Sequence, residues 1–177
     1  MRLASMTLIV GIFLLSVISG FANDLPHIRK DYYNAINNEK AAEKLYLNLK
    51  ARNSSEPIIM AYLGSAQAIR ARHSFNPYNK VTYLKSGLKT LETAVRSSPQ
   101  DLEIRFLRFS LEHYIPSFLG YSKHLETDRA KIVELAKQRK FGAMDKALLI
   151  NLLNFMKETK RCSKQEIATL DHAINNG

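Results

Sequence analysis

Apolar residues recur at helical spacing through almost all of the chain after Asp24, and no segment shows the period-two alternation of a half-buried strand. In the clearest segment, successive apolar residues are three or four positions apart: Val81, Leu84, Leu88, Leu91 and Val95. Residues at this spacing share one face of a helix, which can then pack against another element. The pattern therefore predicts an all-α fold.

Prolines and polar residues divide this pattern into about eight helices. Pro57 and Pro77 stand in the first turn of a predicted helix, where a missing N–H is tolerated, and Pro116 ends another. Ser163 and Glu166 have capping-box spacing before the last one. Short connections favour antiparallel neighbours, so we expect stacked helical hairpins or an irregular bundle. The predicted helices cover residues 25–37, 39–52, 56–73, 76–97, 99–115, 123–140, 144–160 and 163–175.

The first 22 residues have the pattern of a secretory signal peptide. Arg2 is their only charge, their apolar centre covers residues 7–18, and small residues at Gly20 and Ala22 are typical of a processing site. We predict cleavage after Ala22, leaving a single helical domain over residues 23–177. The alternative is an uncleaved anchor helix, because about 20 uncharged residues can just span a bilayer.

The composition agrees with an exported globular domain. Hydrophobic residues make up 46% of the 177, and there are only 7 Gly and 5 Pro, which excludes collagen-like, low-complexity and disordered chains. Cys162 is the only cysteine, so no intramolecular disulfide can staple the fold. This favours the periplasm or the exterior of a bacterium over a small animal-type secreted module.

Part of the chain resembles a degenerate tetratricopeptide hairpin. Leu63-Gly64 matches the first helix of that repeat, and Gly87-x3-Leu91, Ala94 and Pro99 match the second, with small residues where the helices must approach closely. Met60 and Gln67 stand where the repeat has aromatic residues, and residues 73–80 make the hairpin longer than a standard repeat. The resemblance implies a non-catalytic module that binds a peptide or protein along a concave face.

The sequence lacks the motifs of several chemistries. There is no phosphate-binding glycine motif, nucleophile elbow or calcium loop, and no two of the five histidines have zinc-site spacing. We therefore expect no catalytic residue, no cofactor and no metal. We expect Cys162 to be a lone solvent-facing thiol in an inter-helix turn; the alternative is a reactive thiol whose pKa is lowered by the neighbouring Lys and Arg residues.

Residues 105–129 form the least ordinary stretch, because aromatic and charged residues concentrate there around Pro116 and Gly120. Aromatic and Arg groups often meet ligands. The candidate binding pocket consists of Arg105, Arg108, Glu112, Tyr114 and Tyr121.

Two other interpretations of this stretch stay open. In one, Phe118, Leu119 and Tyr121 pack under neighbouring helices, while Arg105 or Arg108 pairs with Glu112 and Asp128. In the other, the protein is a small envelope enzyme whose site lies around Arg105, Glu112, His113 and Tyr121.

The net charge of +10 is spread along the chain, with one local excess between residues 58 and 98. Glu92 is the only acidic residue in this segment. Three of its basic residues form a candidate basic face on one side of a helix: Lys85, Lys89 and Arg96. No nucleic-acid-binding motif accompanies them, so we expect no nucleic acid partner. A basic face on an exported domain is suited to anionic phospholipid, lipopolysaccharide or an acidic protein, and otherwise serves solubility alone.

These observations predict an exported, non-catalytic protein that binds another macromolecule, with a protein or peptide as the expected partner. The small envelope enzyme is one alternative. A peripheral module held on an anionic envelope surface by the basic face is the other.

Overall fold

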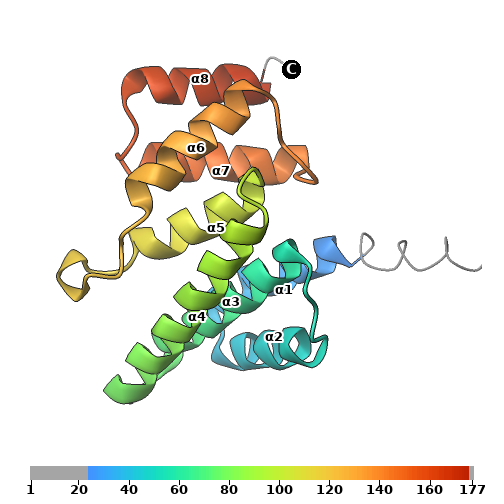
Figure 1. Cartoon of the computed structure of the whole chain (residues 1–177), viewed down its shortest axis with the longest axis vertical. Helices are drawn as coiled ribbons and strands as arrows, with labels where there is room; N and C mark the ends of the chain where they lie inside the picture. Colours follow the sequence, from blue (N-terminus) through green and yellow to red (C-terminus); the bar gives the residue numbers. More distant parts are fainter. Residues whose placement is uncertain (1–23, 176–177) are drawn as a thin grey trace, which may run out of the picture.

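The computed structural model describes residues 24–175, which form eight α-helices and one 3₁₀ turn (Figure 1). These residues contain no strand, so the predicted all-α fold is confirmed. The predicted signal peptide and its cleavage after Ala22 lie outside the described residues. Within 24–175, no helix is long and apolar enough to cross a membrane. In chain order the elements are α1 Leu25–Asn37, α2 Glu39–Ala51, α3 Pro57–His73, α4 Pro77–Ser97, α5 Leu102–His113, η1 Ser117–Leu119, α6 Leu125–Lys137, α7 Lys146–Glu158 and α8 Lys164–Asn175.

Side-chain caps set several of the helix starts. The Asp101 carboxylate accepts the backbone N–H of Ile104 at the start of α5. At the start of α8 the predicted capping box forms: the Ser163 N–H donates to Glu166 Oε2 at 2.8 Å, and the Glu166 N–H donates to Ser163 Oγ at 3.2 Å. Because such bonds satisfy backbone donors that lack helical partners, local sequence predicts these boundaries well.

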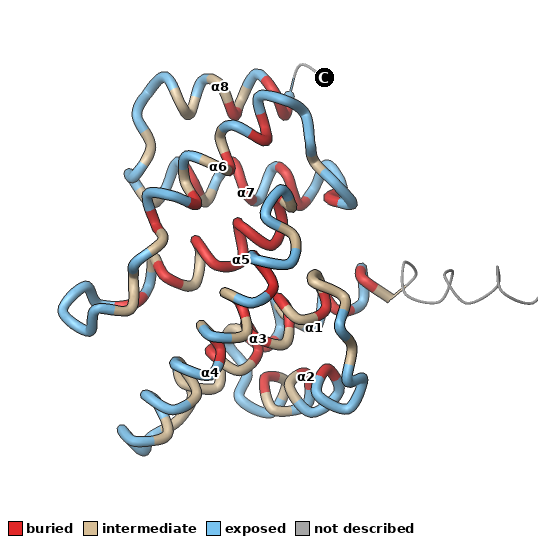
Figure 2. Tube along the Cα trace, in the orientation of Figure 1, coloured by how far each residue is buried: buried red, intermediate tan, exposed pale blue. Residues whose placement is uncertain are grey.

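The helices of the described residues pack around two hydrophobic cores, and α5 contributes side chains to both. The first core lies among α1–α4 and includes Ile104 and Leu107 of α5. The second lies among α6–α8 and includes Phe106 and Phe109 of α5. Since helices cover α5 on both sides, it is buried along most of its length (Figure 2). Its charged side chains therefore need partners inside the protein.

The α3–α4 hairpin packs through two glycines. A Cβ added at Gly87 would lie 2.5 Å from the Gly64 carbonyl oxygen, and one added at Gly64 would lie 2.8 Å from the Gly87 carbonyl oxygen. Two backbones can approach this closely only where neither residue has a side chain. The turn of this hairpin, which we call the hairpin tip (residues 74–81), projects from the body of the molecule (Figure 1).

Candidate functional site

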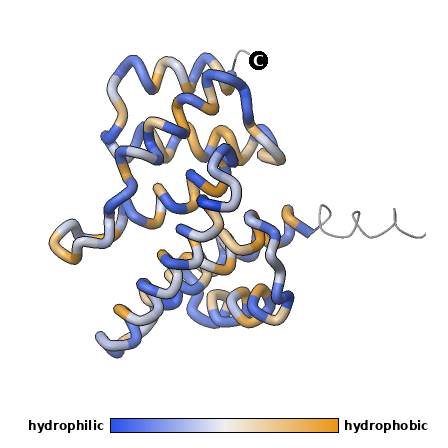
Figure 3. Tube along the Cα trace, viewed as in Figure 1, coloured by the Kyte–Doolittle hydropathy of each residue, from blue (hydrophilic) through white to orange (hydrophobic). Residues whose placement is uncertain are grey.

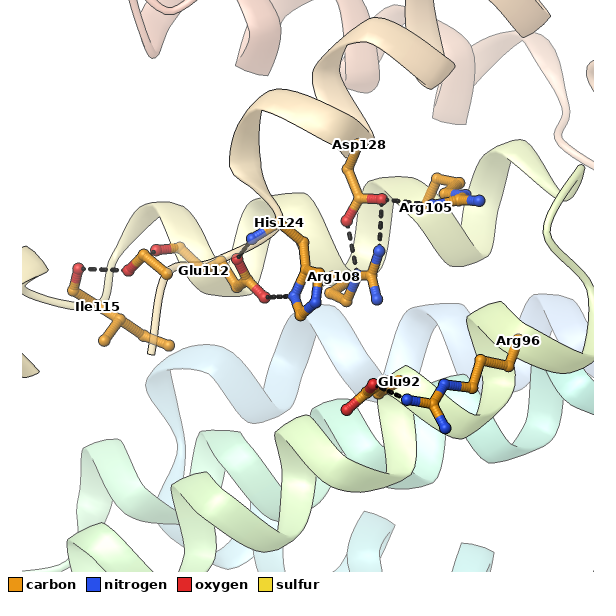
Figure 4. A network of polar contacts seen from close by, with 9 residues as sticks. Glu92, Arg96, Arg105, Arg108, Glu112, Ile115, His124 and Asp128 are labelled. Atoms are coloured by element: carbon orange, nitrogen blue, oxygen red, sulfur yellow. Dashed lines mark hydrogen bonds and ion pairs between the residues drawn. The ribbon is translucent and has the colours of Figure 1, made fainter. Parts of the chain in front are cut away.

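Two arginines of the candidate pocket share one buried carboxylate. Arg105 Nη1 donates to Asp128 Oδ1 at 2.8 Å, and Arg108 donates through Nε to Oδ2 at 2.7 Å and through Nη2 to Oδ1 at 2.8 Å (Figure 4). Asp128 is 0% exposed, and Arg105 Nε also donates to the Pro99 carbonyl. The expected pairing with Asp128 therefore occurs, and it joins α5 to α6.

Glu112 binds the start of α6 rather than an arginine. Its carboxylate accepts the His124 backbone N–H and contacts His124 Nδ1, both at 2.7 Å (Figure 4). Ser122 Oγ donates to the backbone carbonyls of Glu112 and Ile115, which closes the base of the α5–α6 connection. The expected pairing of Glu112 with Arg105 or Arg108 is wrong, because both arginines donate to Asp128 and His124, just before α6, donates to Glu112.

A third buried charge group lies on the other side of α5, and sequence analysis did not find it. Arg29 donates to both oxygens of Glu103 at 2.8 and 2.5 Å, and the Tyr62 hydroxyl donates to Glu103 Oε1 at 2.5 Å. The hydrogen bonds to Glu103 raise the pKa of Arg29, and burial followed by the Glu103 charge raises that of Tyr62. These residues come from α1, α3 and α5, so no local spacing could have revealed the group.

The remaining candidate residues of this stretch, His113 of the enzyme alternative and Tyr114 and Tyr121 of the candidate pocket, contact other side chains. His113 Nδ1 accepts from Arg161 Nε at 3.0 Å, and burial, assisted by the Arg161 charge, lowers the pKa of His113. Tyr114 is 73% exposed and its ring lies against those of His113 and Phe155. Tyr121 is half-buried with Lys85 Nζ 5.8 Å from its ring centroid. Arg105, Glu112, His113 and Tyr121 therefore each meet a different partner.

Two pockets are found elsewhere. One, of about 320 Å³, lies between α2 and the α3–α4 hairpin and is lined by Glu43, Arg70 and Phe75 among others. The other, of about 510 Å³, lies beside α6 and α8 and is lined by Lys137 and His172 among others. None of the five candidate pocket residues lines either of these two.

The expectation that Phe118 and Leu119 pack under neighbouring helices is wrong. They lie in η1, and Phe118 is 85% exposed. Gly120, with φ of +69°, turns the chain back toward α6, so η1 projects outward as a short loop. We call residues 116–121 the connection tip; Figure 3 shows its apolar residues at the edge of the molecule.

Exposed aromatic residues also occupy the hairpin tip, where Phe75 is 96% and Tyr78 is 77% exposed. Tyr78, Val81 and Lys85 are three and four positions apart on α4, so they follow one face, and Lys85 lies beside Tyr121. The two tips are therefore linked along α4. We call this region the aromatic–basic surface; its residues are Phe75, Tyr78, Val81, Lys85, Lys89, Phe118, Leu119 and Tyr121.

The candidate basic face contributes two of its three residues to this surface. Lys85 and Lys89 are exposed, and neither forms an ion pair within residues 24–175. Arg96 instead pairs with Glu92 one turn away on α4, which balances its charge (Figure 4). The lysines stand out in the sequence, whereas Phe75 and Tyr78 do not; the sequence signal for them is two aromatic residues flanking Asn76-Pro77 in a polar turn.

Cys162 does not have the environment that its neighbours in sequence predict. Burial, with a contribution from the Glu166 carboxylate, raises the pKa of its half-buried thiol to about 11. The alternative of a thiol pKa lowered by cations is wrong, because a charge acts through its position in space and Glu166 outweighs Arg129 here. No group of three His, Cys, Asp or Glu residues in the described part of the chain is arranged to hold a metal ion.

No protein-family model, curated protein or solved structure matches this chain. The residues that resemble a tetratricopeptide hairpin lie in α3, in α4 and at Pro99 just after α4. A functional assignment therefore depends on the surfaces and contacts described above.

Proposed function

We propose that this chain is an exported, non-catalytic docking module that binds another macromolecule or a macromolecular assembly through its aromatic–basic surface. The observation that carries the proposal is the exposure of three aromatic rings, Phe75, Tyr78 and Phe118, on two projecting tips linked by Lys85. Clustered exposed apolar groups rimmed by polar residues are typical of interaction sites. Such rings lose contact with water when a partner covers them, which stabilises the complex.

The contacts of the candidate enzyme residues support a non-catalytic role. A catalytic group must reach the reacting atoms in a common site. Arg105 is engaged by Asp128, Glu112 by His124, and His113 by Arg161. These pairs tie α5 to α6 and to the turn before α8, so a structural role accounts for the charged residues of this stretch.

We retain the tetratricopeptide resemblance of the α3–α4 hairpin as part of the proposal. The repeat uses small residues where its two helices approach, and Gly64 and Gly87 meet at this point. In helical-repeat proteins such hairpins are scaffolds for binding surfaces. The α3–α4 hairpin would serve here as the support of one projecting tip.

Binding to envelope fractions tests this function. Both cores lie within residues 25–174, so the predicted mature form, residues 23–177, contains the whole described fold. We expect it to bind an envelope fraction, and the double variant Lys85→Gln/Lys89→Gln to bind more weakly. The matched control is Lys137→Gln/Lys164→Gln, which removes the same charge from α6 and α8. Equal binding by both double variants would contradict the proposed surface.

A further inference from the structure

The two tips project from the same side of the molecule. In Figure 1 the hairpin tip lies at the lower left and the connection tip at the left, beyond the ends of the other helices. The Lys85–Tyr121 contact places the connection tip beside α4, the helix that leads from the hairpin tip. One broad, gently curved partner could therefore touch both tips at once, whereas the start of α1 lies on the opposite side (Figure 1).

The tips carry the side chains that a lipid–water interface favours. Phe75 and Phe118 are almost fully exposed, and Tyr78 presents a ring with a polar hydroxyl. Aromatic rings concentrate at the headgroup level of membranes, where an apolar body and a polar edge are both accommodated. Phe75 and Tyr78 stand on one projection and Phe118 on the other. A protein partner would need a separate shaped pocket for each, whereas a fluid interface admits both without one.

The chain segments that form the tips carry charge of one sign, whereas on the α2 side Phe75 lines the pocket to which Glu39 and Glu43 contribute. Residues 57–91 and 113–125 contain no Asp or Glu, while Lys85, Lys89 and Lys123 are exposed there. The nearest acidic residue on α4, Glu92, is paired with Arg96. Lysines near an anionic bilayer each strengthen attachment, and the attraction decays within a Debye length.

We propose that the aromatic–basic surface docks onto an anionic phospholipid bilayer, with Phe75 and Phe118 inserted among the headgroups and Lys85 and Lys89 against their phosphates. This inference rests on the proposed docking function and names its partner. Insertion of a few rings supplies apolar burial and the lysines supply attraction, the two contributions on which interfacial binding depends.

Single tryptophans provide a direct reporter, because the chain contains none. We would place one at each tip, as Phe75→Trp and Phe118→Trp in the predicted mature form, and one on α2 as the control Leu47→Trp, at an exposed position. With vesicles of phosphatidylcholine and phosphatidylglycerol, emission from both tip positions should shift to shorter wavelength and be quenched by brominated acyl chains. Emission from position 47 should not change.

Vesicle sedimentation measures the two contributions separately. Phe75→Ser/Phe118→Ser and Lys85→Gln/Lys89→Gln should each weaken binding by at least about tenfold. Lys137→Gln/Lys164→Gln and Leu47→Ser should change it by less than about twofold. Vesicles of phosphatidylcholine alone should bind far less protein, and added salt should weaken binding to the anionic vesicles.

Different negative results distinguish a failure of the bilayer proposal from a failure of the proposed docking function. If the mature form binds an envelope fraction through Lys85 and Lys89 but does not sediment with protein-free anionic vesicles, the bilayer is not the partner. An acidic protein then takes its place, and the docking function stands. Sedimentation without any change in emission at positions 75 and 118 would also overturn the inference, because another surface would be in contact. If neither envelope fractions nor vesicles bind, both proposals fall.

Discussion

Helix α5 and the two projecting tips differ in which kind of residue they bury and which they expose. α5 buries Glu103, Arg105, Arg108 and Glu112 between two cores, whereas the tips hold aromatic rings in solvent. The charged residues that resemble a binding site in the sequence form hydrogen bonds and ion pairs inside the fold. The apolar residues that look like packing material form the surface. Charge pattern and hydropathy indicate which residues are unusual, and only their position shows what they do.

The energetic consequences differ for the same reason. A buried charge is tolerated only with a partner, so removing one member of a pair leaves an uncompensated charge inside the protein. An exposed ring contributes little to folding, since its environment in the folded chain resembles that in the unfolded one. Substitutions in α5 and α6 should therefore affect stability, and substitutions at the tips should affect binding.

The largest effect should follow from Asp128→Asn. This change leaves Arg105 and Arg108 buried without their shared carboxylate, and we expect the free energy of unfolding to fall by about 3 kcal/mol or more. Urea unfolding followed by circular dichroism measures the loss. Glu126→Gln, an exposed position in the same helix, is the control and should cost less than about 1 kcal/mol. An unchanged urea midpoint for Asp128→Asn would mean that these pairs do not support the fold.

Gly87→Ala should give the next largest loss. The added methyl group would lie 2.5 Å from the Gly64 carbonyl oxygen, so α3 and α4 must separate. We expect a cost of about 1–3 kcal/mol, although alanine is ordinarily the better helix former. Thermal unfolding gives the comparison, with Ser86→Ala at the neighbouring exposed position as the control. A more stable Gly87→Ala protein would show that the hairpin is looser than described.

A smaller effect on stability is expected at His113, which lies at the end of α5 between the buried Glu112 and the exposed Tyr114. Because burial and Arg161 lower the pKa of His113 below its ordinary 6.5, the unfolded chain takes up this proton at a higher pH than the folded chain. Stability should therefore decline as the pH falls below about 6.5, until folded His113 is also protonated. His113→Gln should flatten this decline between about pH 7 and pH 5 in urea titrations, whereas His27→Gln on α1 should leave His113's contribution in place. A decline equally steep in His113→Gln would contradict the assignment.

The smallest change in stability should come from the tips. Phe75→Ser and Phe118→Ser remove rings with little buried area, so each should shift the free energy of unfolding by less than about 0.5 kcal/mol. Thermal unfolding of the double variant measures this directly. A loss comparable to that of Asp128→Asn would show that the rings pack in the fold and are not free to bind.

Local sequence predicted the helices because their determinants are local. Apolar spacing, Pro57 and Pro77 in first turns, and the Ser163–Glu166 box all act within a few residues, and the observed bounds agree closely with those predicted. The contacts that decide the site act between distant segments. Arg29 meets Glu103, and Lys85 meets Tyr121, across separations that no spacing rule covers.

The errors have the same origin. An apolar connection such as residues 115–121 has the composition of a buried segment, but η1 and Gly120 direct it away from the nearest helices. Glu112 has arginines at helical spacing, yet His124 supplies the donors that reach it. Sequence analysis could therefore select residues 105–129 as unusual without showing which of them face solvent.

Amide hydrogen exchange with and without anionic vesicles shows directly which segments the bilayer covers. When phosphatidylglycerol vesicles are added to the predicted mature form, amides of residues 74–76 and 117–121 should exchange more slowly, while those of α7 and α8 should not change. Slower exchange confined to α6–α8, or none at either tip while the protein is bound, would contradict the account.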